Sequence, residues 1–322
     1  MNCLRPPTLD EIRSANERVR SVAVRTPLLR LNVDDAPAEI YLKMENLQAI
    51  GSFKVRPAAS AILNTPKEQL VDGVYTASSG NMAQGVAYAA RQLGIPATVL
   101  LPPDAAEVKV AALKRLNANI RTLPDDEWWQ VIHDHGHPDI PGKFIHPVAS
   151  QDVVAGSGTV GMEIFEDLPD VDTVLVPFGG GGLSCGIASA FRALNPNVKV
   201  LGAESKHCAP LTAALEAGHP VQLPIPHTFI SGIGVGKVLD EMWPLVSDLL
   251  QGAVVASMED IANTVRLLLE RNRVVAEGAG AAPVAAALAG KGGTGKVVCV
   301  ISGGNLDRRY LLDILQGKVP QV

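Results

Sequence analysis

A lysine in the first quarter of the chain and three short segments after it have residue types that could bind a phosphate and carry out amine chemistry. Lys54 lies in residues 51–56, which read GSFKVR. Its apolar neighbours Phe53 and Val55, together with the cation of Arg56, are expected to lower the pKa of the Lys54 amine, so that the free amine can form a Schiff base with an aldehyde. An isolated lysine of this kind is usually a solvated surface residue, so the reactive interpretation depends on the other three segments.

A run of four glycines follows an apolar strand expected over residues 171–177 and precedes a helix expected to begin near Leu183. Backbone N–H groups of successive glycines converge on an anion, and a helix N-terminus adds partial positive charge. Leu183 and Ser184 follow the fourth glycine, so the Gly-x-Gly-x-x-Gly fingerprint is missing and a monophosphate fits better than a dinucleotide. A flexible turn and a nucleotide-binding loop are the alternatives. The glycines are Gly179, Gly180, Gly181 and Gly182.

Two more segments place small polar residues directly after apolar runs. Residues 78–82, SSGNM, lie between an expected strand and an expected helix, and so provide a second helix N-terminus that suits a carboxylate group. Residues 302–305, SGGN, place a hydroxyl group at the end of the apolar run 297–301. Each segment alone is a weak signal, but the order and the separations of all four are specific.

Taken together, the four segments resemble the fold-type II pyridoxal-phosphate enzymes, in their threonine dehydratase and serine racemase branch, over almost the whole chain. The resemblance implies that pyridoxal 5′-phosphate is bound covalently to Lys54, next to Phe53, and that the glycine run and Leu183 hold its phosphate. It also implies that Asn81 contacts the ring oxygen of the cofactor and that Ser302 hydrogen-bonds its pyridine nitrogen. A hydroxyl group at this position leaves the nitrogen essentially neutral, which favours elimination over transamination.

The resemblance also assigns residues to the substrate. Glu277 is expected near the cofactor or the substrate, with a purely structural role as the alternative. Ser79 matches the residue that serves serine racemases as the acid/base on the second face of the substrate, with helix capping as the alternative. The residues implied to contact the substrate are Ser78, Ser79, Gly80, Asn81, Met82 and Gly232.

Short apolar runs rich in β-branched residues alternate with helical patterns, which predicts an α/β fold with parallel strands covered by helices. The resemblance narrows this to the fold-type II architecture, similar to the tryptophan synthase β chain, with two lobes that each contain a mostly parallel sheet flanked by helices. It implies a large cofactor-binding lobe over residues 1–72 and 150–322 and a small substrate-closing lobe over residues 73–149. The expected strands are 74–77, 97–101, 174–177, 199–203 and 297–301, and the expected helices are 8–22, 83–93 after Asn81 as N-cap, 107–116, 183–194 and 258–271.

The activity that the resemblance implies is that of an amino-acid ammonia-lyase. The enzyme would remove the β-hydroxyl group of a β-hydroxy amino acid, with Lys54 as general base, and yield a 2-oxo acid and ammonia. The alternatives are an amino-acid racemase of the serine type and a β-replacement synthase of the cysteine synthase type, which the glycine-rich residues 231–236 favour. From other classes, a non-catalytic metabolite-binding protein and a nucleotide-binding dehydrogenase are the alternatives.

Three residues depart from the pattern of this branch. Pro57 follows Arg56 where relatives have glycine, Met82 replaces a histidine, and Ser231 precedes Gly232 where dehydratases have an aspartate. All three lie near the expected position of the substrate side chain. They leave its identity open, and phenylserine and hydroxyaspartate are among the candidates.

A metal site is a further question. Glu204 matches a residue that binds a divalent cation, Mg²⁺ or Ca²⁺, in metal-binding relatives, but Pro210 stands where those relatives have a second acidic residue. This difference counts against a metal site and favours a buried, hydrogen-bonded role for Glu204. Residues 133–137, HDHGH, are crowded by glycine and proline, so we expect a solvated loop there.

The composition is that of a compact globular protein and excludes several partners. The 322 residues are 47% hydrophobic and 19% charged, and a net charge of −5 without any basic tract argues against a nucleic-acid partner. No apolar run approaches the roughly 20 residues needed to span a bilayer, so no membrane partner is expected. Four cysteines without paired spacing favour reduced thiols in the cytoplasm. The resemblance implies a homodimer that acts on a small-molecule amino acid.

Overall fold

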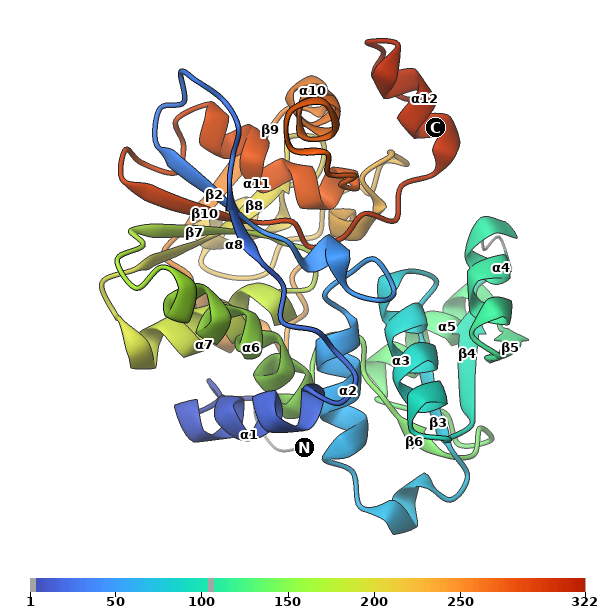
Figure 1. Ribbon diagram of the computed structural model, residues 1–322. Coiled ribbons are helices and arrows are strands. Elements are labelled where there is room, and N and C mark those ends of the chain that lie inside the picture. The colour runs from blue at the N-terminus through green and yellow to red at the C-terminus, as the bar shows by residue number, and fades with distance from the viewer. Residues whose placement is uncertain (1–3, 104–106, 322) are drawn as a thin grey trace.

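Two mostly parallel β-sheets, each covered by helices, make up the computed structural model, which describes residues 4–103 and 107–321 (Figure 1). Among the described strands of the larger sheet, only the first runs antiparallel to its neighbour. In spatial order the strands of this sheet are β1 (Leu28–Arg30), β2 (Glu39–Lys43), β10 (Lys296–Val300), β7 (Thr173–Pro177), β8 (Lys199–Ser205) and β9 (Ala253–Ala256).

The central strands β7 and β10 are buried, as their uninterrupted apolar sequences require. Helices α10 (Met258–Leu267) and α11 (Gly278–Leu288) cover the face of the sheet that is uppermost in Figure 1. Helices α6 (Gln151–Asp167) and α7 (Gly182–Leu194) cover the opposite face. Burial on both faces fixes these strands, and with them the loops that leave their carboxyl ends.

The smaller sheet consists of four parallel strands, in the spatial order β5 (Asn119–Thr122), β4 (Ala97–Leu101), β3 (Val74–Ala77) and β6 (Lys143–Phe144). Its helices are α3 (Asn81–Gln92), α4 (Glu107–Arg115) and α5 (Asp125–His133). Helix α2 (Val55–Leu63) lies between the two sheets in Figure 1 and packs against both α3 and α6. All four strands fall inside residues 73–149, the range predicted for the small lobe, although the lobe boundaries themselves remain a prediction.

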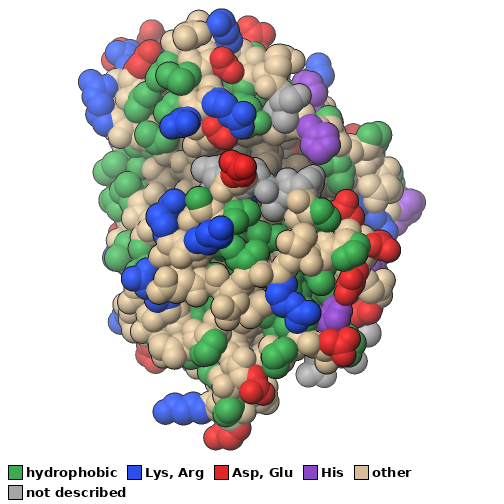
Figure 2. Space-filling view, turned by 90° about the vertical axis from the view of Figure 1, so that its right-hand side faces the viewer, with side chains coloured by type: hydrophobic (Ala, Val, Ile, Leu, Met, Phe, Trp, Pro, Cys, Tyr) green, Lys and Arg blue, Asp and Glu red, His purple; other side chains and the backbone are tan. Residues whose placement is uncertain are grey.

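The remaining helices lie around the larger sheet. They are α1 (Leu9–Val19), α8 (Pro210–Ala217), α9 (Trp243–Leu249) and α12 (Arg308–Leu315). Within the described part of the chain, no helix is both long enough and apolar enough to cross a membrane. On the face shown in Figure 2, basic and acidic side chains both occur, and neither sign dominates that face.

The predicted elements are present, with differences at their ends. The strands predicted over 74–77 and 97–101 coincide with β3 and β4. Asn81 is the first residue of α3 and Gly80 is its N-cap, so the prediction of Asn81 as the cap is wrong. The helix predicted over 258–271 changes after Leu267 into a π-helical turn (Leu268–Asn272). Strands β2 and β5 were missed because charged or polar residues interrupt their apolar runs.

Candidate active site

The Lys54 segment lies against the end of strand β10. The backbone N–H of Phe53 donates to the carbonyl oxygen of Ser302 at 2.9 Å, and the N–H of Gly304 donates to the carbonyl oxygen of Gly51 at 2.8 Å. Gly51 has a φ of +70°, a left-handed conformation that favours glycine. These contacts bring together two of the four segments that the sequence singled out, 51–56 and 302–305.

The Lys54 amine is held in a largely dry position. Its Nζ atom donates to the carbonyl oxygen of Pro147 at 2.8 Å and lies 5.2 Å from the centroid of the Phe53 ring. Burial lowers the pKa of Lys54 from 10.5 to about 8. The neutral amine, which is the form that reacts with an aldehyde, is therefore much easier to reach than in a surface lysine.

Arg56 does not contribute to this shift, contrary to the expectation from the sequence. Its buried guanidinium group pairs with Glu45 and Glu163 at 2.7–2.8 Å, and Lys43 joins the same cluster through Glu163 at 2.6 Å. The two carboxylates neutralise the Arg56 cation between α2 and α6. The positive charge of Arg56 thus belongs to a structural cluster, and burial alone accounts for the lowered pKa of Lys54.

The glycine loop joins β7 to α7 and begins that helix. Gly181 has a φ of +90°, and Gly182 is the first residue of α7. A Cβ atom on Gly180 would lie 2.5 Å from Cγ2 of Val148, and one on Gly179 would lie 3.0 Å from the carbonyl oxygen of Gly232. Larger residues would therefore be crowded at positions 179 and 180. The first turn of α7 offers N–H groups that have no acceptor within the helix, which suits a phosphate.

A chain of amide and carboxyl groups connects the remaining segments. Asn305 donates through Nδ2 to Oδ1 of Asn81 at 2.8 Å and to the carbonyl oxygen of Ile50 at 2.9 Å. Asn81 in turn donates through Nδ2 to Oε1 of Glu277 at 2.8 Å. Burial raises the pKa of Glu277 to about 7, against the opposing effect of the bond from Asn81. Gly232 lies beside this carboxyl group, since a Cβ atom on it would be 3.4 Å from Oε1.

Asn305 was not predicted as a site residue. It is part of the SGGN segment, but its contacts are made with residues more than 200 positions earlier in the chain. Ser302, at the start of the same segment, follows β10 and is 4% exposed. The segment therefore supplies both a hydroxyl group and an orienting amide.

The serine-containing loop lies between β3 and α3, half-buried. Ser78 accepts from the N–H of Gly80 at 3.3 Å, and no side chain caps α3, so the alternative that Ser79 acts as a helix cap is wrong. The loop is anchored near Lys54 because a Cβ atom on Gly85 of α3 would lie 2.5 Å from the Lys54 carbonyl oxygen. The Met82 side chain is 2% exposed and packs in the core, so only its backbone is placed to meet a ligand.

Glu204 caps a helix. Its carboxylate accepts from the N–H of Leu211 at 2.7 Å, the N–H of Thr212 at 2.9 Å and the Thr212 hydroxyl at 2.7 Å, at the start of α8. Pro210, which replaces the second acidic residue, is the first residue of that helix. This is the buried, hydrogen-bonded role favoured from the sequence, and both carboxylate oxygens are already used.

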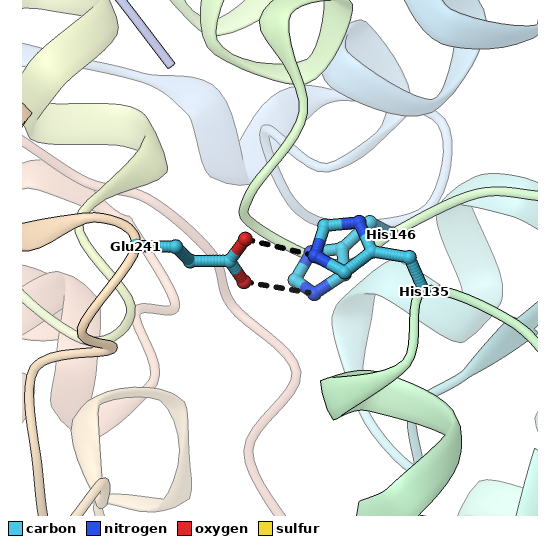
Figure 3. Close-up of side chains that lie close together, drawn as sticks. All are labelled: His135, His146 and Glu241. Atoms are coloured by element: carbon cyan, nitrogen blue, oxygen red, sulfur yellow. Dashed lines mark hydrogen bonds and ion pairs between the residues drawn. The ribbon is translucent and has the colours of Figure 1, made fainter. Parts of the chain in front are cut away.

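Among the described residues, one group could offer three metal-ligating atoms: His135, His146 and Glu241 (Figure 3). The two imidazole rings stack with centroids 4.4 Å apart, and the Glu241 oxygens lie 2.8 Å from Nε2 of His135 and 3.8 Å from Nε2 of His146. The expectation of a solvated loop is wrong for His135. Because the two rings are stacked, the lone pairs of their nitrogens lie in nearly parallel planes and do not converge on one point. This arrangement does not suit a metal ion shared by both rings.

The residues present fit pyridoxal phosphate. Lys54 provides a buried amine with a lowered pKa, residues 179–182 provide an anion cradle with little room for side chains at positions 179 and 180, and Ser302 provides a hydroxyl group at the end of a central strand. Asn81 is oriented by hydrogen bonds on both sides. These groups come from the carboxyl ends of β3, β7 and β10 and from the start of α2.

Comparisons with known proteins point to the same cofactor. A family model described as "Pyridoxal-phosphate dependent enzyme" matches residues 19–303. The chain is 39% identical over 312 residues to an L-threonine ammonia-lyase of Geobacter sulfurreducens, covering 95% of this chain and 77% of the relative. It is 36% identical to a catabolic L-threonine dehydratase of Escherichia coli, covering 94% of each chain. The structure is similar to that of maize serine racemase, with a TM-score of 0.89, 32% identity, and coverage of 97% and 98%.

Proposed function

The chain belongs to the pyridoxal-phosphate-dependent enzymes, and from this premise we propose that it eliminates water from a β-hydroxy amino acid of the threonine or serine type. It is an ammonia-lyase, and its products are a 2-oxo acid and ammonia. The observation that carries the proposal is the buried Lys54 amine, with its lowered pKa, next to the Ser302 segment at the end of β10.

The chain's own residues would hold the cofactor at four points. The glycine loop and Leu183 would hold the phosphate, Lys54 would bind the aldehyde carbon, Asn81 would contact the ring oxygen, and Ser302 would hydrogen-bond the pyridine nitrogen. Phe53 borders the Lys54 amine. When bound, pyridoxal phosphate withdraws electrons from the substrate's α-carbon and so makes its proton acidic.

Lys54 serves as the general base. Its Nζ atom would accept the α-proton of the bound substrate, and a pKa of about 8 makes this amine a usable base near neutral pH. Ser78, Gly80 and Asn81, together with the first N–H groups of α3, hold the substrate carboxylate and orient the Cα–H bond. The electron pair of the Cα–H bond would form a Cα=Cβ double bond and expel the β-hydroxyl group, which leaves as water with one proton, equivalent to the one that Lys54 took up. The enamine that is released takes up water and yields the 2-oxo acid and ammonia.

Ser302 favours this outcome over transamination. A carboxylate at this position would keep the pyridine nitrogen protonated and would prolong the lifetime of negative charge at Cα. A hydroxyl group does not, so that charge is better relieved by loss of the β-hydroxyl group. Glu277 is held through Asn81 and supports its orientation.

A second activity, racemisation, is favoured by one observation. The Ser79 hydroxyl makes no cap on α3 and lies in a half-buried loop, which leaves it available to protonate the second face of Cα. We therefore propose Ser79 as the acid/base of a racemase side activity. The Ser79→Ala variant should lose racemisation and keep elimination, and loss of both activities would contradict this division of roles.

The test of the main proposal is release of 2-oxo acid from L-serine, L-threonine, threo-3-hydroxyaspartate and 3-phenylserine, with chiral analysis of the remaining amino acid. Strong release from one of them without its enantiomer would support the elimination and would identify the side chain. Accumulation of the enantiomer without oxo acid would support a racemase. Neither product, with pyridoxal phosphate bound, would point to β-replacement with an added thiol.

We also propose that residues 73–149 form a small lobe that closes over the substrate, that residues 1–72 and 150–322 form the large lobe, and that the enzyme is a cytoplasmic homodimer. The position of the four-stranded sheet within 74–144 supports the division into lobes.

The apolar side chains of Leu312 and Leu315, exposed on α12, support a dimer, and light scattering of the purified protein tests it. Three buried free thiols, Cys185, Cys208 and Cys299, suit a reducing compartment, while Cys3 lies outside the described residues.

A further inference from the structure

Residues 146–149, HPVA, connect β6 of the smaller sheet to α6, which covers one face of the larger sheet. These residues contact two parts of the proposed cofactor site. The Pro147 carbonyl oxygen accepts from Nζ of Lys54 at 2.8 Å. The Val148 side chain packs against the glycine loop, because a Cβ atom on Gly180 would lie 2.5 Å from Val148 Cγ2. The shape of this turn therefore affects both the amine and the phosphate cradle.

The imidazole ring of His146 holds the turn together from within. Its Nδ1 atom accepts from the N–H of Val148 at 3.0 Å and from the N–H of Ala149 at 2.6 Å. The His146 side chain is 3% exposed, so water cannot easily replace this acceptor. Two backbone N–H groups thus depend on a single ring nitrogen.

These two bonds also decide where the proton of the ring lies. Since Nδ1 accepts, the proton of the neutral ring is on Nε2, which is buried and has no hydrogen-bond partner among the described residues. Burial, together with the nearby His135 and Lys54, lowers the pKa of His146 to about 3, so the ring stays neutral at physiological pH. A metal ion at Nε2 would require the proton to move to Nδ1, which would break both of these hydrogen bonds, so the arrangement in Figure 3 does not favour a metal centre.

We propose that His146 is a positioning residue: through Nδ1 it holds the turn 146–149 in the shape that gives Lys54 its acceptor and places Val148 against the glycine loop. Glu241 faces the Nε2 edge of the ring and His135 stacks on its face, and neither is needed for this role (Figure 3). The inference rests on the proposed function in that Lys54 and the glycine loop are taken as the cofactor site.

Replacement of His146 with asparagine or glutamine tests which ring nitrogen matters, because each side-chain amide stands near the position of a different nitrogen. In His146→Asn the Oδ1 atom is attached to Cγ, as Nδ1 is, and so an acceptor for the two N–H groups is kept. In His146→Gln the amide is one bond further out, near the position of Nε2, and that acceptor is lost. Glu241→Gln is the matched control because it changes the group that faces Nε2 of His146 and Nε2 of His135 and leaves the Nδ1 bonds of His146 untouched.

For each protein we would measure the dissociation constant of pyridoxal phosphate, the pH titration of the absorbance of the bound cofactor, and the melting temperature. We expect His146→Gln to bind the cofactor about tenfold more weakly and to shift the titration midpoint, since one lost hydrogen bond corresponds to about that factor. We expect His146→Asn and Glu241→Gln to stay within about twofold of the unmodified protein. Equal effects of Asn and Gln at position 146, or no effect of Gln, would overturn the inference.

A measurement on the unmodified holoenzyme covers the case in which the variants do not fold. Nitrogen-15 NMR of the histidine rings should show one non-titrating ring with an unprotonated Nδ1 and a protonated Nε2, and a proton on Nδ1 of His146 would overturn the inference. Failure of the proposed reaction is distinguishable. An unmodified protein that binds pyridoxal phosphate but releases no 2-oxo acid would refute the elimination, and the comparison of cofactor binding among the variants would still stand.

Discussion

Replacing Lys54 with methionine should stabilise the cofactor-free protein at neutral pH, although it removes the residue proposed to be essential for the reaction. Methionine has a similar length and no charge, so it keeps the packing around Phe53. The fall in the pKa of Lys54 from 10.5 to about 8 means that burial disfavours the charged amine by about 3 kcal/mol. Methionine leaves the Pro147 carbonyl oxygen without its donor, which costs about 1 kcal/mol. The net expectation is a gain of about 2 kcal/mol at pH 7.

The sign of the effect depends on pH. Between about pH 8 and 10.5 the unfolded chain binds more protons at Lys54 than the folded chain, so the stability of the unmodified protein rises with pH in this window. The advantage of Lys54→Met should therefore shrink above pH 8. By pH 10.5 it should reverse to a loss of about 1 kcal/mol, which is the lost hydrogen bond alone.

Urea unfolding of both cofactor-free proteins at pH 7, 8.5 and 9.5, at one protein concentration, would measure this difference. The control is Lys67→Met, because Lys67 is exposed and lies outside the proposed site, so it shows what a lysine-to-methionine change at the surface does under the same conditions. If the difference between Lys54→Met and the unmodified protein were constant with pH, the amine would not be held in the dry position described above. The assignment of Lys54 as an activated amine would then lose its physical basis.

Three other substitutions test separate parts of the site. Gly180→Ala should weaken binding of pyridoxal phosphate by about tenfold, since the new Cβ atom would overlap Val148, and Val148→Ala in the same chain should restore it, as equilibrium titration would reveal. Arg56→Met should lower the free energy of unfolding by about 3 kcal/mol or more in urea titrations, because two buried carboxylates lose their partner. An unchanged midpoint would contradict the neutralising role of that cluster. Asn305→Ala should weaken cofactor binding by about tenfold through misorientation of Asn81, and unaltered affinity would count against the amide chain.

The sequence was sufficient where a residue's role depends on its own segment. Glycines between a strand and a helix, a lysine in apolar surroundings and a serine after a central strand are local patterns. The structure places the glycines and the serine at the ends of the neighbouring strands β7 and β10, and the lysine segment against the end of β10. The contacts of Arg56 could not be read in the same way. Its partners Glu45 and Glu163 lie 11 positions before it and 107 positions after it, and no periodicity relates them.

The same reason explains why residues 146–149 and Asn305 were missed. Pro147 contributes only a carbonyl oxygen, which every residue has, and His146 acts on backbone N–H groups two and three residues away. Nothing in their residue types distinguishes them from an ordinary connection between a strand and a helix. Their roles follow only from contacts in space. Residues 146–149 contact Lys54 and the glycine loop, and Asn305 contacts Asn81 and Ile50.

The environment of Lys54 is assembled from both sheets. Its backbone begins α2, its carbonyl oxygen is in close contact with Gly85 of α3, and its amine donates to Pro147, which follows β6 of the smaller sheet. The Ser302 carbonyl, at the end of β10 in the larger sheet, fixes the preceding residue. Because burial is what lowers the pKa of Lys54, any movement of residues 73–149 relative to the larger sheet changes both the burial and the acceptor of the amine. The basicity of the Lys54 amine therefore depends on the position of the smaller sheet. The pKa of the amine is lowered by the burial that the two sheets provide when they are packed as they are here.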